Sequence, residues 1–561
     1  MTATAETQKP VSLTARSLSG RFWRFSAAFV AIAVLAPALA LGWEAFGPSQ
    51  GLWAHLLANV LTQAVVDTAI LLAGVGLLVM ALGTSAAWLV TAYAFPGRRI
   101  LEWALLLPLA VPTYIIAYAY LDILHPVGPV QGTIRALLGY SSPREFRLPD
   151  VRSMAGCILL LGFVLYPYVY ITTRAMFLTQ AANLVEVSRT LGVRRSAVFW
   201  RVALPLARPA IAVGVSLALM ETLNDIGASE FLGVRTLTIS VYTTWVTRGD
   251  LAGAAQIALA MLAVVIVLLA MERYARRRQR YFATAQRARR FTPQHLGPIA
   301  GVAAFAVGII PVLIGFVAPA TYLTVEAAKR MKVNGISPRL YGETLNTILF
   351  AGAATLAVLV FGTVVAYAAR ALPGRATALF QRLSTLGYAM PGTVLAIGIL
   401  IPVAALDGLI DRVSQMLFGV PTGLLLIGSG AALGYAYVAR FLAIAAGSIE
   451  SGYSRIPRSF DQAARSLGRT VGGTFRAVHL PLSKTALAAA GLLVFVDCMK
   501  ELPATLLLRP LNFETLATHL YGEAARGTYE EAAVAALAIV LVGTLPVMLL
   551  ARIGRRESGE D

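Results

Sequence analysis

Residues 189–206 read RTLGVRRSAVFWRVALPL, and residues 465–482 read RSLGRTVGGTFRAVHLPL. Both stretches contain a leucine–glycine pair, a phenylalanine seven residues after that glycine, and a closing leucine–proline pair. Corresponding residues of the two stretches are 276 positions apart. A repeat at a fixed offset indicates that one architecture occurs twice in the chain.

The same offset, within a few residues, relates other parts of the chain. Pro96-Gly97-Arg98 matches Pro373-Gly374-Arg375 at 277, Asp67-Thr68 matches Asn346-Thr347 at 279, and Ala254-Ala255 matches Ala532-Ala533 at 278. The sequence therefore predicts two homologous halves. We expect an N-terminal tail at 1–24, a first half at 25–271 with its loop at 181–208, a basic linker at 272–297, a second half at 298–552 with its loop at 447–484, and a C-terminal tail at 553–561.

Composition places these halves in a membrane. Of the 561 residues, 58% are hydrophobic and 13% are charged, and the mean hydropathy is +0.72. Apolar runs of about 20 residues are long enough to cross a bilayer, and they must be helical because the hydrocarbon offers no partners to the backbone. We expect an all-α polytopic protein with about twelve spans, near 25–44, 62–95, 100–124, 154–179, 209–232, 252–271, 298–322, 344–370, 378–405, 421–446, 484–508 and 530–552.

The charge distribution predicts how the spans are oriented. The net charge is +19, with 47 Lys and Arg against 28 Asp and Glu, but the arginines lie in short segments between apolar runs, as in cytoplasmic loops, rather than on a nucleic-acid-binding face. Six spans in each half return the chain to its starting side. We therefore expect cytoplasmic termini and two halves related by a pseudo-twofold axis along the membrane normal.

The chain shows few signs of metal or disulfide chemistry. Cys157 and Cys498 each lie inside an apolar run, so neither a disulfide framework nor a cysteine metal site is predicted. The five histidines are scattered in the sequence, and we assign none of them as a metal ligand.

In the repeated loop, a small-residue break at Leu191-Gly192, which corresponds to Leu467-Gly468, separates two short helical stretches, and the second stretch leads into a membrane span. Phe199 and Val202 are three residues apart, and so are Phe475 and Val478, which places each pair on one helical face. A proline follows within three residues of each pair, where the first turn of the next helix tolerates it. An amphipathic helix lying on lipid headgroups would share these features, but it would not require the same spacing twice.

These residues, E-x-x-R-x-L-G followed by F-x-x-V-x-L-P-L, closely resemble the EAA loop of permease subunits of binding-protein-dependent ATP-binding-cassette (ABC) importers. The resemblance implies a type I importer fold in which each loop forms a coupling helix that sits in a groove of a cytoplasmic ATPase. The residues that it marks for ATPase coupling are Glu186, Arg189, Gly192, Phe199, Val202 and Pro205 in the first copy, and Gln462, Arg465, Gly468, Phe475, Val478 and Pro481 in the second.

The second copy departs from this pattern at one position. Gln462 stands where the family has glutamate, so an ion pair with an arginine of the ATPase is not expected there unless the neighbouring Asp461 replaces it.

Nucleotide chemistry is expected to reside in another polypeptide. The chain has no G-x-x-x-x-G-K-[ST] phosphate-binding loop, and a Gly-Lys pair never occurs. The chain is thus expected to be a transport subunit rather than an enzyme, with no cofactor of its own. The implied partners are two ATPase subunits that bind ATP and magnesium, a periplasmic substrate-binding protein and membrane lipid.

Two acidic residues stand out in the fifth predicted span of each half. Glu221 and Asp225 are four residues apart, as are Asp497 and Glu501, and the pairs correspond at an offset of 276. Carboxylates in apolar spans usually face a wet interior, which makes these residues candidates for the translocation pathway. The alternative is a structural role, either at the helix breaks near Gly227 and Pro503 or in pairing with Lys500.

The substrate is indicated only by resemblance. The string DCMKELPATLLLRPLNFETLA at 497–517, in a chain that fuses both halves, is most similar to bacterial ferric-iron importers of the inner membrane, with thiamine and phosphonate-type permeases as alternatives. An ion-coupled secondary transporter that uses the four carboxylates is a further alternative, but it needs no ATPase docking loop. A signalling or structural scaffold would lack any catalytic or sensor domain to serve.

Overall fold

The computed structural model describes residues 13–47, 57–178, 195–276, 293–335 and 337–558. Within these residues the chain is almost entirely helical. Nine helices are long and apolar enough to cross a membrane, or eleven spans if two bent helix pairs are each counted as one. The all-α polytopic fold class is confirmed.

The chain divides into two compact units, one built around residues 346–504 and the other around residues 45–345. Unit 1 contains α1 (Leu13–Glu44), most of α16 (Pro338–Ala371), α17 (Arg375–Ser384), η6 (Leu386–Ala389), α18 (Gly392–Phe418), α19 (Leu425–Gly428), α20 (Ala431–Ser454), α21 (Arg458–Ser466), α22 (Val471–Thr474), η7 (Phe475–His479), α23 (Leu480–Leu482), α24 (Lys484–Met499) and the ends of α25 (Pro503–Leu508).

Unit 2 contains the remaining elements. They are η1 (Leu57–Leu61), α3 (Thr62–Ala92), β1 (Tyr93–Ala94), α4 (Arg98–Ala104), η2 (Leu107–Ala110), α5 (Thr113–Ile123), α6 (Pro129–Leu138), α7 (Met154–Met176), α9 (Arg195–Val198), η4 (Phe199–Ala203), α10 (Leu204–Asn224), α11 (Gly227–Phe231), α12 (Leu237–Val246), α13 (Leu251–Arg276), β2 (Gln294–His295), α14 (Pro298–Val312), η5 (Leu313–Val317), α15 (Ala318–Asn334), α26 (Leu516–Arg526) and α27 (Tyr529–Ser558). The two-residue strands β1 and β2 pair in parallel.

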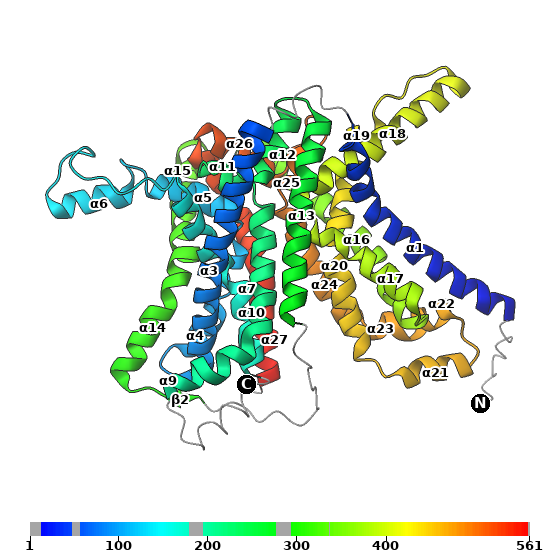
Figure 1. The fold of residues 1–561 in the computed structure, drawn as a ribbon, viewed down its shortest axis with the longest axis horizontal. Coiled ribbons are helices and arrows are strands. Elements are labelled where there is room, and N and C mark those ends of the chain that lie inside the picture. The colour runs from blue at the N-terminus through cyan, green and yellow to red at the C-terminus, as the bar shows by residue number, and fades with distance from the viewer. Residues whose placement is uncertain (1–12, 48–56, 179–194, 277–292, 336, 559–561) are drawn as a thin grey trace. The chain divides into compact units, whose positions relative to one another are not determined.

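The compact units cut across the sequence repeat, because the first helix of each half packs in the unit formed mainly by the other half. In unit 1, α1 lies along α17 and α18 (Figure 1). There, a Cβ atom added to Gly398 would lie 2.4 Å from the carbonyl oxygen of Pro37, so the two helices are in close backbone contact. In unit 2, Tyr120 of α5 donates a hydrogen bond to the carbonyl oxygen of Ile314 in η5 at 2.7 Å.

Glycine also allows the close packing of the long helices in unit 2. A Cβ atom on Gly83 of α3 would lie 2.8 Å from the carbonyl oxygen of Tyr166 in α7, and one on Gly214 of α10 would lie 2.6 Å from the Cα atom of Val169. Membrane helices lack a hydrophobic driving force for association and rely on such close contacts. The α3, α7 and α10 helices therefore form the packed centre of this unit.

Some predicted spans have different limits in the structure. The span predicted at 100–124 is a bent pair, Arg98–Ala110 with Thr113–Ile123, whose halves meet at 93°. The span predicted at 378–405 is wrong as a single helix, because α17 and η6 end before the Met390–Pro391 break and α18 starts at Gly392. The span predicted to start at 421 begins at Ala431 with α20.

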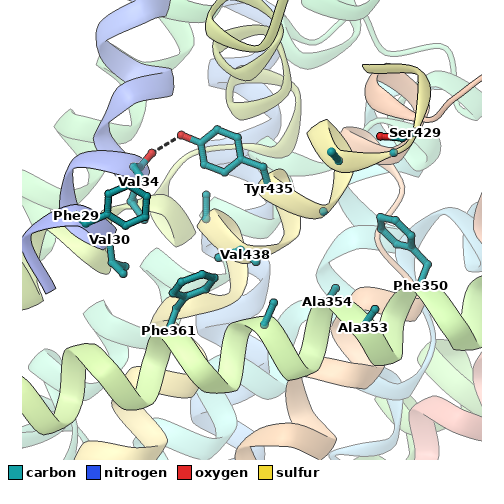
Figure 2. Close-up of a pocket in the computed structure, with 16 residues that line it drawn as sticks. Phe29, Val30, Val34, Phe350, Ala353, Ala354, Phe361, Ser429, Tyr435 and Val438 are labelled. Carbon is teal, nitrogen blue, oxygen red and sulfur yellow. Dashed lines mark hydrogen bonds between the residues drawn. The ribbon is translucent and has the colours of Figure 1, made fainter. Parts of the chain in front are cut away.

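A cavity of about 640 Å³ opens within unit 1 between α1, α16 and α20 (Figure 2). Its walls are almost entirely apolar, with Phe29, Phe350 and Phe361 among the lining residues. The hydroxyl of Tyr435, at its edge, donates a hydrogen bond to the carbonyl oxygen of Ala33 and so ties α20 to α1.

Candidate coupling loops and membrane carboxylates

The first repeated loop is described from Arg195 onward, so Glu186, Arg189 and Gly192 lie outside the described residues. The ring of Phe199 in η4 packs against Trp88 of α3, with ring centroids 5.2 Å apart. Val202 is half-buried, and Pro205 is the second residue of α10, where its missing N–H costs nothing. The loop thus leads directly into the span that follows it.

The second loop is described in full, and it breaks where the sequence predicts. Helix α21 ends at Ser466, and Gly468 adopts a φ of +83°, the left-handed conformation that glycine enters without steric cost. The Thr470 side chain then accepts a hydrogen bond from the N–H of Gly473 at 3.0 Å and caps α22. Gln462 and Arg465 are exposed on α21, although Arg465 also donates to the carbonyl oxygen of Ala371 at 2.9 Å.

Phe475 and Val478, which the spacing places on one face of η7, are both half-buried. The Phe475 ring packs inside unit 1 against Trp23, at 5.2 Å between centroids, and Tyr367, at 4.9 Å. Pro481 is exposed in α23, just before the 75° bend into α24. Phe475 therefore anchors its loop to α1 and α16.

The apolar side chains that the second loop presents to solvent are different ones. Phe460 is 49% exposed and Leu467 is 76% exposed. They are seven residues apart, about two helical turns, with Phe460 in α21 and Leu467 directly after its last residue. This pair was missed in the sequence, although the i, i+7 spacing of two large apolar residues in a polar segment could have indicated it.

Gln462 stands where the family has glutamate, and Asp461 is the possible replacement for that glutamate. The Asp461 side chain does not face outward, however. One of its carboxylate oxygens binds Arg370 at 2.7 Å, and the other lies 2.5 Å from Nε2 of His479. Burial alone would raise the pKa of Asp461, but the hydrogen bonds from His479 and Arg370 outweigh it and hold the pKa below its ordinary value. The carboxylate is thus ionised and engaged within unit 1.

In unit 2, Asp225 follows the last residue of α10 and is buried. Its carboxylate accepts hydrogen bonds from the N–H of Ala228 at 2.9 Å and from the hydroxyl of Thr113 at 3.3 Å. The contact with Ala228 satisfies an N–H group in the first turn of α11, as the structural alternative predicts. Glu221 lies one turn earlier and is half-buried.

In unit 1, the corresponding residues have similar surroundings. Glu501 is buried, accepts a hydrogen bond from the N–H of Ala504 at 3.1 Å, and lies 3.9 Å from Arg440. Asp497 pairs with Lys500 at 2.8 Å. Both helix breaks therefore have a carboxylate brace, while a role of the four acids in the pathway stays a prediction.

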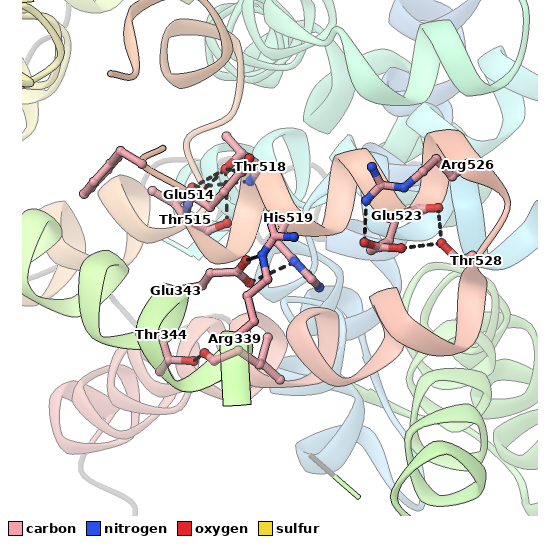
Figure 3. A network of polar contacts seen from close by, with 12 residues as sticks. Arg339, Glu343, Thr344, Glu514, Thr515, Thr518, His519, Glu523, Arg526 and Thr528 are labelled. Atoms are coloured by element: carbon pink, nitrogen blue, oxygen red, sulfur yellow. Dashed lines mark hydrogen bonds and ion pairs between the residues drawn. The ribbon is translucent and has the colours of Figure 1, made fainter. Parts of the chain in front are cut away.

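A further polar network in unit 2 was missed in the sequence (Figure 3). Glu343, near the start of α16, is buried and lies 2.8 Å from Nδ1 of His519 in α26, and it also binds Arg339 at 2.9 Å. Among the described residues, no group of three or more His, Cys, Asp and Glu side chains is arranged to hold a metal ion. His519 is here a partner of a buried carboxylate that links two helices.

The two halves of the chain each match one protein family, described as "Binding-protein-dependent transport system inner membrane component", at residues 79–281 and 359–557. The chain belongs to this family. It is a fused, two-half permease of the ABC importer class, and a multi-pass inner-membrane protein. The starts of the two matches are 280 positions apart and their ends 276, in agreement with the repeat.

Similar permeases differ in the substrates for which they are named. The Fe(3+)-transport system permease protein FbpB 2 of Haemophilus influenzae is 24% identical over 494 residues, which are 86% of this permease and 88% of that protein. The molybdenum transport system permease protein ModB of Escherichia coli K12 is 30% identical over 189 residues, 33% of this permease and 79% of that protein. ModB of Mycobacterium bovis is 30% identical over 251 residues, 43% of this permease and 88% of that protein.

Proposed function

We propose that this permease forms the transmembrane pathway for ferric iron, which a periplasmic binding protein delivers and two subunits of a separate ATPase drive across the membrane. The observation that carries the substrate assignment is the similarity to the Fe(3+)-transport permease, which extends over 86% of the chain and thus over both fused halves. The two ModB proteins match 33% and 43% of the chain.

The chemistry of the acidic residues supports a cation over an oxyanion. Ferric iron prefers oxygen ligands, and carboxylates are the side chains that would lower the cost of moving a hard cation through an apolar medium. Asp225 and Glu501 are both buried at the ends of membrane helices.

The ATPase assignment is supported by the two repeated loops. In the second loop, Phe460 of α21 and Leu467, the residue that follows α21, are exposed, and a large apolar pair surrounded by polar residues is typical of a protein–protein contact. The chain has no phosphate-binding loop, so the hydrolysis of ATP, with its magnesium, falls to the partner.

The experiment that tests this proposal uses the complete transporter in proteoliposomes. The cognate binding protein is loaded with ferric iron, molybdate or thiamine, and uptake of each is measured with ATP and without it. We expect ATP-dependent uptake of iron alone. Uptake of molybdate or thiamine in place of iron would refute the substrate assignment, and uptake without ATP would refute the ATPase coupling.

A further inference from the structure

The end of span α16 is fastened to the second loop by one arginine. Arg370 is the penultimate residue of α16, and its guanidinium donates to Oδ2 of Asp461 from Nη2 at 2.7 Å and from Nε at 3.1 Å. The same guanidinium donates to the carbonyl oxygen of Tyr453 at 3.1 Å and to that of Ile456 at 2.8 Å. Arg370 thus holds the end of α20 and the start of α21 together.

His479 completes the connection from the other side of the loop. Its Nε2 atom lies 2.5 Å from Oδ1 of Asp461, so both oxygens of that carboxylate are occupied by cross-links. The imidazole is fully buried and lies between the rings of Tyr367 and Tyr453, each with its centroid at 5.1 Å. Its Nδ1 atom has no hydrogen-bond partner among the described residues, so Asp461 is its one polar contact there.

The network is specific to the second half of the chain. At the offset of 276, the counterparts of Asp461 and His479 in the first half are Val185 and Ala203. The counterpart of Arg370, at offsets of 277 to 279, falls within Thr91–Tyr93, which contains no basic residue. The first loop therefore cannot form this set of ion pairs.

We propose that Arg370, Asp461 and His479 are positioning residues that join α21 to the end of span α16, so that a displacement of α21 moves α16 with it. This inference rests on the proposed function, in which α21 meets the ATPase. Because the counterparts in the first half carry none of these charges, we expect the two ATPase subunits to act on unequal connections.

The physical chemistry of the network supports a rigid connection. The side chains of Arg370 and Asp461 are 13% and 17% exposed. Two guanidinium N–H groups converge on Oδ2 of Asp461 while His479 contacts Oδ1, so both oxygens of the carboxylate are held by charge-assisted contacts. Removing one member of a largely buried pair leaves the other charge without compensation, which is why such pairs resist separation. A flexible loop would give the two helices independent motion.

The test uses Asp461→Asn in the complete transporter, because asparagine keeps the size of the side chain and removes its charge. We expect exchange of the α21 backbone amides with deuterium to rise about tenfold, the change expected for loss of a charge-assisted hydrogen bond. We also expect fewer substrate molecules transported per ATP hydrolysed, with unchanged recovery of the ATPase.

Two variants of His479 distinguish a role in positioning α21 from a role in the stability of the permease alone. His479→Gln retains a side-chain N–H that can reach Asp461 and should preserve the ratio of transport to ATP hydrolysis, whereas His479→Leu fills the space without a donor and should lower that ratio. The matched control is Asp150→Asn, in the exposed Arg147–Asp150 pair, which should change none of these measurements. If the Asp461→Asn permease fails to assemble, the comparison of His479→Gln with His479→Leu provides the test instead.

Each other outcome overturns a defined part of the inference. Unchanged amide exchange in Asp461→Asn would refute the connection itself. Faster exchange with an unchanged ratio of transport to hydrolysis would refute its role in coupling. Failure of the unmodified permease to retain any ATPase would instead refute the proposed function, and the coupling role with it.

Discussion

Asp225 and Glu501 make the same contact in the two halves of the chain: each carboxylate accepts a hydrogen bond from the backbone N–H three residues further on. The distances are 2.9 Å to the N–H of Ala228 and 3.1 Å to that of Ala504. The repeat thus preserves a function of the carboxylate as well as its position, since each one caps the short helix that follows the break.

The double variant Asp225→Asn with Glu501→Gln tests whether these caps also serve the pathway. The amide oxygens can still accept the backbone hydrogen bonds, so we expect unchanged ATPase recovery, although loss of the Glu501 charge beside the buried Arg440 should lower the thermal midpoint. Uptake should be abolished, because the negative charges that offset the cost of a cation in the membrane are removed. Normal uptake by this variant would show that the carboxylates act only as braces.

The left-handed conformation of Gly468 gives a prediction about the second loop. Gly468→Ala should destabilise it by about 1 kcal/mol, because an added Cβ disfavours positive φ, while no atom within 4 Å would clash with it. The measurement is the thermal midpoint of the purified permease. Gly447→Ala in α20 is the matched control: it also meets no atom within 4 Å, so an equal loss there would contradict the backbone explanation.

The packing of α1 on α18 depends on the absence of a side chain at Gly398. Gly398→Ala would place a Cβ atom 2.4 Å from the carbonyl oxygen of Pro37, and such overpacking costs about 1–3 kcal/mol. The thermal midpoint should fall accordingly. Gly408→Ala, in the same helix with no atom within 4 Å, should leave it unchanged or raise it.

The exposed apolar pair Phe460 and Leu467 predicts where the ATPase binds. Leu467→Asp should lower recovery of the ATPase in a pull-down about tenfold, since a charge would be buried in the contact. Leu511→Asp is the control, because Leu511 is 95% exposed and lies outside the loop. Full recovery of the ATPase with Leu467→Asp would show that the ATPase does not dock on this apolar pair.

The depressed pKa of Asp461 sets the pH range of its contribution. A carboxyl group with a lowered pKa in the folded state stabilises that state fully above the ordinary aspartate pKa of about 3.9. This contribution is lost as the pH falls through the lower, folded-state pKa. The difference in α21 amide exchange between the unmodified permease and Asp461→Asn should therefore persist at pH 5 and disappear at more acidic pH. A difference that is already lost at pH 5 would contradict this assignment.

The sequence predicted the features that depend on local pattern. The repeat, the helical class, the break at Gly468 and the alternative of a helix brace at Asp225 and Glu501 all follow from spacing and residue type. The exposed Phe460 and Leu467 could have been found by the same reasoning. The bend of 93° within 98–123 could not, because an apolar run looks the same whether it is straight or broken at a Val-Pro pair.

Features that depend on distant residues were beyond the sequence. Nothing in the neighbourhood of Asp461 indicates that Arg370, 91 positions earlier, reaches its carboxylate. The sequence therefore left Asp461 as a candidate for an external contact. In the same way, hydrophobicity shows that α1 is a membrane helix but does not show which helices it contacts.

The exchange of first helices has a consequence for how the permease can be divided. A cut in the linker would produce one fragment that carries α1 but lacks α17 and α18, and another that carries α14 and α15 but lacks α5 and α7. Each fragment would be missing a wall of its own compact unit and would have to recruit the other to complete it. Synthesis as a single polypeptide ensures that both halves, each of which supplies its first helix to the other unit, are present in equal numbers and at high effective concentration. Fusion of the halves therefore serves assembly as much as transport.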